Sequence, residues 1–184
     1  CYERENRSNN GDGRRELDRE EIGFVAERLS RQGIRHCTIT DGEPLLTQAS
    51  REKCEVLIEK FPICYLVTNG TFELPDYPVL YIVSLDGPQE IHDKLRGDGV
   101  FQRIKENVKR APTDLIYGLM TISTRNHRFI GETLQAAKEI GLRGMMFNWY
   151  TPFSLEDRLW LSYEERGKNI DQIVRLIETA GEFI

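Results

Sequence analysis

The amino-acid sequence predicts an α/β fold in which parallel strands alternate with helices. Short β-rich apolar runs alternate with segments whose apolar residues recur at helical spacing. The pattern repeats about every 30 residues, the size of a βα unit with a right-handed crossover. Small polar residues or glycine follow nearly every β-rich run. A barrel uses nearly every strand end for its ligands, whereas a doubly wound sheet uses fewer of them. We therefore expect a barrel-like fold with its site along that rim.

The elements are predicted in order from local signals. Residues 3–20 are almost all polar and predict a long surface loop. Asp18 and Glu21 then have the spacing of a capping box, and a helix runs from there to a stop at Gly33. The remaining elements are a strand over 36–40, a helix from about Thr47, strands over 64–68 and 79–84, a helix around 100–110, a strand over 115–122, a helix through 134–140, a strand over 145–149, and a terminal helix opened by a capping box of Ser162 and Glu165. The connection between the second and third strands is proline-rich and too short for a regular helix.

Composition limits the class of protein. A length of 184 residues fits one domain with a substantial core, and a hydrophobic share of 39% excludes disorder of the whole chain. The formal net charge of -5 argues against nucleic acid as a partner. No apolar run approaches the roughly 18 residues of a membrane span.

Cys37, Cys54 and Cys64 lie in apolar segments without C-x-x-C spacing, so we expect buried free thiols in a cytoplasmic protein.

Polar residues at the strand ends are the candidates for a site. Gly42 and Glu43 follow the first strand, at a turn where glycine permits close approach of a ligand. Asn69 follows the second strand, Ser84 ends the third, and residues 123–126 follow the fourth. Each alone could be a turn or a cap. Their joint placement favours a common site.

A charged trio, His92, Asp93 and Arg96, follows the third strand and has two interpretations. It could hold an anionic substrate, or it could solvate the start of a helix. His36 and His127 are interpreted as satisfied or solvent-facing residues, because no zinc-ligand spacing surrounds them. The sequence contains neither a G-x-x-x-x-G-K-S/T loop nor a G-x-S-x-G elbow, which lowers the nucleotide-triphosphate and serine-hydrolase interpretations.

Four segments occur in a fixed order along the chain: Cys1-Tyr2, Asp41-Gly42-Glu43-Pro44, Thr68-Asn69-Gly70, and Ser84-Leu85-Asp86-Gly87 continued by His92-Asp93 and Arg96-Gly97. Together they resemble the radical S-adenosylmethionine (SAM) superfamily, from Cys1 to about the end of the fifth strand. The last segment is the most specific match. It is similar to a segment of the branch that includes peptide-modifying maturases, molybdenum-cofactor biosynthesis enzymes and lipid-modifying members.

The resemblance implies a partial (β/α)6 TIM-like barrel in which this chain begins after the first strand. The first strand and the first two cysteines of the family's C-x-x-x-C-x-x-C loop would then be missing. Residues 1–184 would form a radical SAM core domain truncated at both the N-terminus and the C-terminus. The family's usual auxiliary-cluster domain would lie beyond Ile184. Because one cysteine cannot hold the family's cluster, the chain as given is predicted to be inactive.

The resemblance also implies the cofactors and their contacts. The family binds a four-iron four-sulfur (4Fe-4S) cluster whose open iron takes the amino and carboxylate groups of SAM. Cys1 would be one ligand of this cluster. The residues implied at SAM are Gly42 and Glu43 at the methionyl amino group, Asn69 and Ser84 at the methionyl carboxylate or ribose, and Asn126 on the same side. Asp41 stands where the family has glycine, which adds a carboxylate at that turn.

The implied chemistry is reductive cleavage of SAM to a 5'-deoxyadenosyl radical that removes a hydrogen atom from the substrate in a closed, dry pocket. An external electron donor would be required. The substrate, a small molecule or a peptide, is not specified by the sequence.

Other functions stay open from the residues alone. The chain could be a non-catalytic barrel that binds a small ligand or a partner. It could be a lipoprotein anchored at Cys1, although three core thiols fit poorly with an oxidising compartment. An aldolase-like or phosphate-binding barrel would need a lysine at a strand end or a late glycine-rich loop, and neither is evident.

Overall fold

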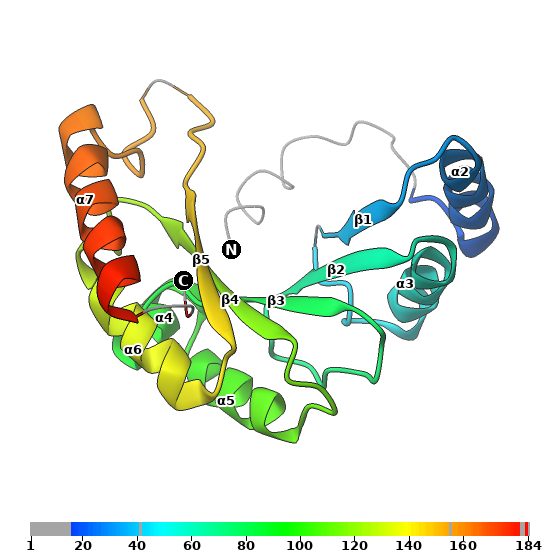
Figure 1. Cartoon of the computed structure of the whole chain (residues 1–184), viewed down its shortest axis with the longest axis horizontal. Coiled ribbons are helices and arrows are strands. Elements are labelled where there is room, and N and C mark those ends of the chain that lie inside the picture. Colours follow the sequence, from blue (N-terminus) through cyan, green and yellow to red (C-terminus); the bar gives the residue numbers. More distant parts are fainter. Residues whose placement is uncertain (1–15, 41, 155, 181–182, 184) are drawn as a thin grey trace.

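The computed structural model describes residues 16–40, 42–154, 156–180 and 183. Its centre is one sheet of five parallel strands in the order of the sequence. The strands are β1 (His36–Ile39), β2 (Ile63–Thr68), β3 (Leu80–Ser84), β4 (Ile116–Ile122) and β5 (Gly144–Trp149). The sheet is curved and does not close, and the helices lie along its outer side (Figure 1). The predicted α/β fold with an open, barrel-like sheet is therefore confirmed.

The helices flank the strands along the chain, and two of them begin at the predicted capping boxes. They are α2 (Arg19–Arg31), α3 (Gln48–Lys60), α4 (Gln89–Arg96), α5 (Val100–Arg110), α6 (Ile130–Ile140) and α7 (Tyr163–Ala180), with a short 3-10 helix η1 (His127–Phe129) before α6. The Asp18–Glu21 capping box is present, with Glu21 N–H donating to Asp18 Oδ1 over 2.9 Å. Ser162 and Glu165 form the corresponding hydrogen bonds at the start of α7. Both predicted caps are confirmed.

The connection from β2 to β3 contains no helix, as its prolines predict. It is nevertheless packed onto the fold. Leu74 is buried, and the Tyr81 hydroxyl donates to the carbonyl of Pro75 over 2.6 Å. The buried Leu74 side chain and this hydrogen bond hold the connection against the fold in the absence of a crossover helix.

The sequence did not predict α4. Its eight residues contain only Ile91 and Leu95 as apolar side chains, and this one pair is too short a pattern to identify a helix from the sequence. The helix starts after Pro88 and ends at Gly97, whose φ of +119° lies outside the range that side chains favour. This short helix carries the charged trio of the sequence analysis.

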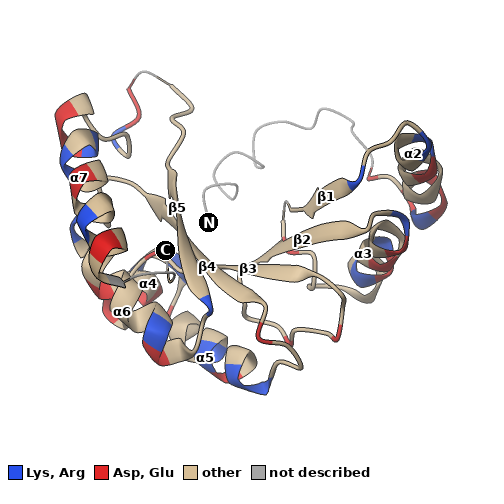
Figure 2. Ribbon diagram, in the orientation of Figure 1, with Lys and Arg blue, Asp and Glu red and all other residues tan. Residues whose placement is uncertain are grey.

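Side chains alternate between two environments across the sheet. Residues such as Leu66, Val83 and Met120 point to the outer helices and form the core. Their neighbours Val67, Ile82 and Leu119 line a cavity of about 830 Å³ on the concave face. Among the described residues that line this cavity, none is an Asp, Glu, Lys or Arg. Figure 2 agrees, because the charged residues lie mainly on the helices and connections while the strands are almost entirely uncharged.

The three cysteines in the described part of the chain are free. Cys54 and Cys64 are buried and Cys37 is half-buried, so the predicted free thiols are confirmed. Within the same described residues, no helix has the length and hydropathy that crossing a membrane requires.

Candidate functional site

The carboxyl ends of the strands form one rim because all five strands are parallel and adjacent. Gly42 and Glu43 follow β1, Asn69 follows β2, and Ser84 is the last residue of β3. Asn126 lies in the connection after β4. The structure therefore brings the predicted residues to the same edge of the sheet. Cys1, the predicted cluster ligand, and Asp41 lie outside the described residues.

Glu43 joins the ends of β1 and β2. Its Oε1 accepts hydrogen bonds from the Thr68 hydroxyl at 2.7 Å and from Leu45 N–H at 3.1 Å, and its Oε2 accepts from Asn69 N–H at 2.7 Å. The carboxylate is half-buried. Each oxygen of a carboxylate can accept about two hydrogen bonds, so Oε2 can still accept one more. Glu43 thus holds two strand ends together and keeps acceptor capacity at the rim.

Gly42 precedes Glu43 and leaves the backbone at this turn accessible to a ligand. Its φ is +56°, in the left-handed region that favours glycine, and a Cβ built there would meet nothing within 4 Å. Gly42 is exposed. A ligand could therefore approach the backbone here without displacing a neighbouring side chain.

Asn69 forms a local turn after β2. Its Oδ1 accepts from the Thr71 N–H at 2.8 Å and from the Thr71 hydroxyl at 2.6 Å, which is the hydrogen bonding of an Asx-turn. The Nδ2 group has no hydrogen-bond partner among the described residues. Asn69 therefore keeps two N–H donors for a ligand.

Ser84 lies on the concave side of β3. It alternates with the buried Val83 and Leu85, and it pairs in register with Leu119, which lines the cavity. Its hydroxyl is half-buried and makes no hydrogen bond within the described part of the chain. Ser84 is thus available as a donor or acceptor at the rim.

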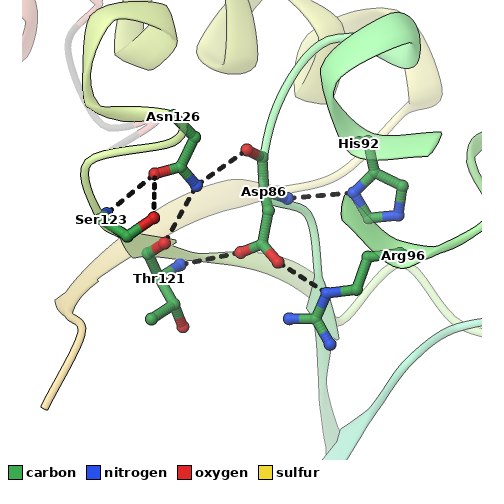
Figure 3. Close-up of polar contacts among 6 residues, drawn as sticks. All are labelled: Asp86, His92, Arg96, Thr121, Ser123 and Asn126. Atoms are coloured by element: carbon green, nitrogen blue, oxygen red, sulfur yellow. Dashed lines mark hydrogen bonds and ion pairs between the residues drawn. The ribbon is translucent and has the colours of Figure 1, made fainter. Parts of the chain in front are cut away.

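Asn126 has a different environment (Figure 3). It is 1% exposed, and its Nδ2 donates to the carbonyls of Asp86 and Thr121, both at 3.0 Å. Its Oδ1 accepts from Ser123 N–H at 2.8 Å and lies 3.3 Å from the Ser123 hydroxyl. Both N–H donors are used within the fold. The structure places Asn126 as a link between the ends of β3 and β4, and direct contact with SAM stays a prediction.

Asp86, for which the sequence predicts no role, is the centre of this link. Its N–H donates to His92 Nδ1 at 3.1 Å, and its carbonyl accepts from Asn126. Its Oδ1 accepts from Thr121 N–H at 3.0 Å, and its Oδ2 pairs with Arg96 Nε at 2.6 Å. Figure 3 shows these partners arranged around it. The only sequence signal for this role was its place in the Ser84-Leu85-Asp86-Gly87 segment.

The side chains of the charged trio are engaged within the fold and do not simply face the solvent. His92 is completely buried, and the Arg96 side chain is only 16% exposed and bound to Asp86. Asp93 accepts from Phe101 N–H at 2.8 Å and so caps the start of α5. The sequence did not reveal these contacts because Asp86 and Phe101, the partners of the trio, lie outside α4.

Burial lowers the pKa of His92 to about 4, with Arg96 adding to the effect and the carboxylates of Asp86 and Asp93 opposing it. Because Nδ1 accepts the Asp86 N–H, the neutral imidazole carries its proton on Nε2. That nitrogen is buried without a hydrogen-bond partner among the described residues. A neutral His92 is therefore part of the folded state.

Comparison with known proteins assigns the chain to a family. The Radical SAM superfamily matches residues 1–113, which is more than half of the chain. The antilisterial bacteriocin subtilosin biosynthesis protein AlbA of Bacillus subtilis (strain 168) is 27% identical over 147 residues, which cover 73% of this chain and 33% of AlbA. The chain belongs to the radical SAM superfamily, and the predicted membership is confirmed.

Solved structures show the same fold at low identity. The anSMEcpe structure with bound AdoMet matches 89% of this chain and 52% of its own, with a TM-score of 0.61 and 17% identity. Streptococcus suis SuiB bound to its precursor peptide SuiA matches 91% of this chain and 41% of its own, with a TM-score of 0.71 and 12% identity. This chain thus spans about a third to a half of the length of these proteins. It is a radical SAM core, and the family's cofactors are a 4Fe-4S cluster and SAM.

Proposed function

We propose that the intact protein is a radical SAM enzyme and that this rim binds SAM. The observation that carries the proposal is the convergence of Gly42, Glu43, Asn69 and Ser84 at the ends of three neighbouring strands in a chain of this family. Glu43 and Ser84 are 41 residues apart in the chain, and only the parallel sheet brings their strands together.

The free hydrogen-bonding groups of the rim fit the amino-acid end of SAM. Glu43 Oε2 can accept from an ammonium group. Asn69 Nδ2 and the Ser84 hydroxyl are donors for a carboxylate or for ribose hydroxyls. Gly42 leaves room for the ligand beside the backbone. Cys1 is proposed as a ligand of the cluster, and Asn126 as a residue that supports the rim.

The concave cavity is proposed as the place where the substrate lies. When bound, the cluster and SAM supply a radical that can remove a hydrogen atom from a nearby substrate group. Val67, Ile82 and Leu119 give the concave face an apolar surface, and none of the described residues that line the cavity is an Asp, Glu, Lys or Arg. An uncharged, largely apolar surface protects a radical from side reactions with water or ionised groups.

A peptide is the substrate that the relatives support. SuiB binds the precursor peptide SuiA, anSMEcpe binds the Kp18Cys peptide, and AlbA is a bacteriocin biosynthesis protein. The uncharged cavity fits the backbone and apolar side chains of a peptide better than a phosphate or a carboxylate. We propose a cytoplasmic peptide-modifying enzyme that takes its electron from an external donor.

Glu43→Gln tests the SAM site. The full-length protein is purified anaerobically, its cluster is reconstituted, and the dissociation constant of SAM is measured by equilibrium dialysis. Because the change removes a charge-assisted hydrogen bond, we expect SAM to bind about tenfold more weakly or worse. Glu139→Gln is the matched control, since Glu139 lies on α6 and bonds only to Gln135 among the described residues.

Two results would contradict the proposal. One is a wild-type protein that holds a cluster and shows no saturable binding of SAM. The other is equal SAM affinity in Glu43→Gln and Glu139→Gln.

A further inference from the structure

Every polar group of Asp86 is held by a partner from outside its own strand. Its N–H and Oδ2 bind His92 and Arg96 of α4, and its Oδ1 and carbonyl bind Thr121 of β4 and Asn126 of the following connection. Asp86 is 2% exposed. One buried residue therefore connects the end of β3 to α4, to β4 and to the connection after β4 (Figure 3).

The carboxylate prolongs the pairing of β3 with β4 beyond the last strand residue. Leu85 N–H donates to the Leu119 carbonyl at 2.9 Å, as a backbone pair would. The N–H of Thr121 then reaches Asp86 Oδ1 instead of a carbonyl of β3. The chain can leave the sheet at Gly87, where a Cβ would lie 2.7 Å from Ile91 Cβ. Asp86 thus fixes the end of β3 at the point where the backbone turns away.

Ser84 lies two residues before Asp86. It lies one residue before Leu85, which makes the last backbone hydrogen bond between β3 and β4. Its hydroxyl has no partner of its own among the described residues, so only the backbone fixes its position. Arg96 in turn orients the Asp86 carboxylate, since its Nε donates to Oδ2 at 2.6 Å. The chain of contacts runs from Arg96 through Asp86 to the backbone that carries Ser84.

We propose that Asp86 is a positioning residue for SAM binding, acting through Ser84. This inference rests on the proposed function, since it assumes that SAM binds at the rim. Asp86 itself touches no ligand in this proposal. Its role is to hold Ser84 and the neighbouring end of β4 in the geometry that SAM requires.

The test is a double-mutant cycle read out by SAM binding. The dissociation constant of SAM is measured by equilibrium dialysis on the full-length, cluster-loaded protein for wild type, Asp86→Asn, Ser84→Ala and the double variant. A misplaced binding group costs about tenfold to a hundredfold in ligand or transition-state affinity, so we expect a loss of that size for Asp86→Asn. In the Ser84→Ala background the same change should have less than a threefold effect, because its target is already absent.

Two further variants separate positioning from general destabilisation. Ile116→Ala creates a cavity at the opposite end of β4, where Ile116 is 2% exposed. It should lower the thermal midpoint as Asp86→Asn does, yet change SAM affinity by less than twofold. Arg96→Lys keeps the charge and loses the Nε contact, so it should weaken SAM binding to an intermediate extent if Asp86→Asn does not fold.

The outcomes distinguish this inference from the proposed function. Wild-type SAM affinity in a folded Asp86→Asn protein, or in Arg96→Lys if Asp86→Asn does not fold, overturns the positioning role. Independent, multiplicative effects of Asp86→Asn and Ser84→Ala do the same. If the cluster-loaded wild-type protein does not bind SAM at all, the proposed function itself fails, and this inference fails with it.

Discussion

Gly70, where the chain leaves β2, shows how strictly single residues are fixed at the rim. Its φ is +72°, and a Cβ at this position would lie 2.6 Å from Val83 Cγ1 and 3.0 Å from Ile104 Cγ1. Its carbonyl accepts from Asn107 Nδ2 at 2.9 Å. A left-handed backbone and a close approach to the core therefore coincide in one residue, directly after the predicted ligand Asn69.

Gly70→Ala should lower the free energy of unfolding by about 2 to 4 kcal/mol, the sum of backbone strain and overpacking. Gly33→Ala is the matched control, because Gly33 has a φ of +87° and open space around its Cβ position. That variant should lose only about 1 kcal/mol from the backbone term. Urea unfolding of the full-length variants measures both, and equal losses would show that the contact with Val83 has no effect.

His92 predicts an acid dependence of stability. Its pKa is lowered to about 4 in the folded state, against 6.5 for the ordinary group. The folded state therefore binds fewer protons than the unfolded state between these values. Its contribution of about 3 kcal/mol is fully present above pH 6.5 and is lost as the pH falls towards 4. Urea unfolding at a series of pH values should show this loss, and His92→Gln should reduce the slope between pH 6.5 and 4. An unchanged slope in the variant would exclude His92 as the cause.

At the scale of elements, α4 is the helix that the local sequence pattern does not predict. It nevertheless supplies the partners of Asp86 at the rim. It supplies His92 and Arg96 to Asp86 on one side. On the other side its Asp93 caps α5, whose N-cap residue Gly99 provides no side-chain cap. One short helix thus joins the end of β3 to the next helix.

Asp93→Ala should destabilise the protein by about 1 kcal/mol, since it removes the hydrogen bond to the Phe101 N–H at the start of α5. Asp93→Asn keeps an acceptor oxygen and should retain most of that stability. Thermal unfolding compares the two variants. A loss of the same size in both would mean that charge rather than capping is responsible.

At the scale of the whole molecule, the sheet separates a charged exterior from an uncharged concave face. The outer face of the sheet packs against the helices, and the inner face lines the cavity. Cys54 and Cys64 lie on the packed side. Burial raises the pKa of both thiols to about 11, so they are protonated and inert at neutral pH.

The rate at which a maleimide modifies the Cys54 and Cys64 thiols should therefore measure how often the core opens. At pH 8 in the folded protein, Cys54 and Cys64 should react at least about tenfold more slowly than in urea, because thiolate is scarce and access is blocked. Cys37 is half-buried and should react faster than either. Mass spectrometry of the labelled peptides measures each cysteine separately. Similar rates for all three would contradict the burial of Cys54 and Cys64.

The sequence by itself determined the alternation of elements in this protein. Capping pairs such as Asp18–Glu21 and runs such as 64–68 act over a few residues, so local physical chemistry specifies them. The rim was also predictable, because polar residues after successive parallel strands must meet at one edge. The prediction failed at α4, whose one pair of apolar side chains spans too few residues to identify a helix.

Only the tertiary structure decided which rim side chains use their hydrogen-bonding groups within the fold and which keep those groups available for a ligand. Glu43 meets Asn69 across 26 residues, and Asn126 meets Asp86 across 40. Such pairings depend on strand order and register, and no local pattern encodes the partner of a buried polar group. For that reason Asn126 and Ser84 look alike in the sequence, while in the fold the amide of Asn126 is fully hydrogen-bonded and the hydroxyl of Ser84 remains free for a ligand.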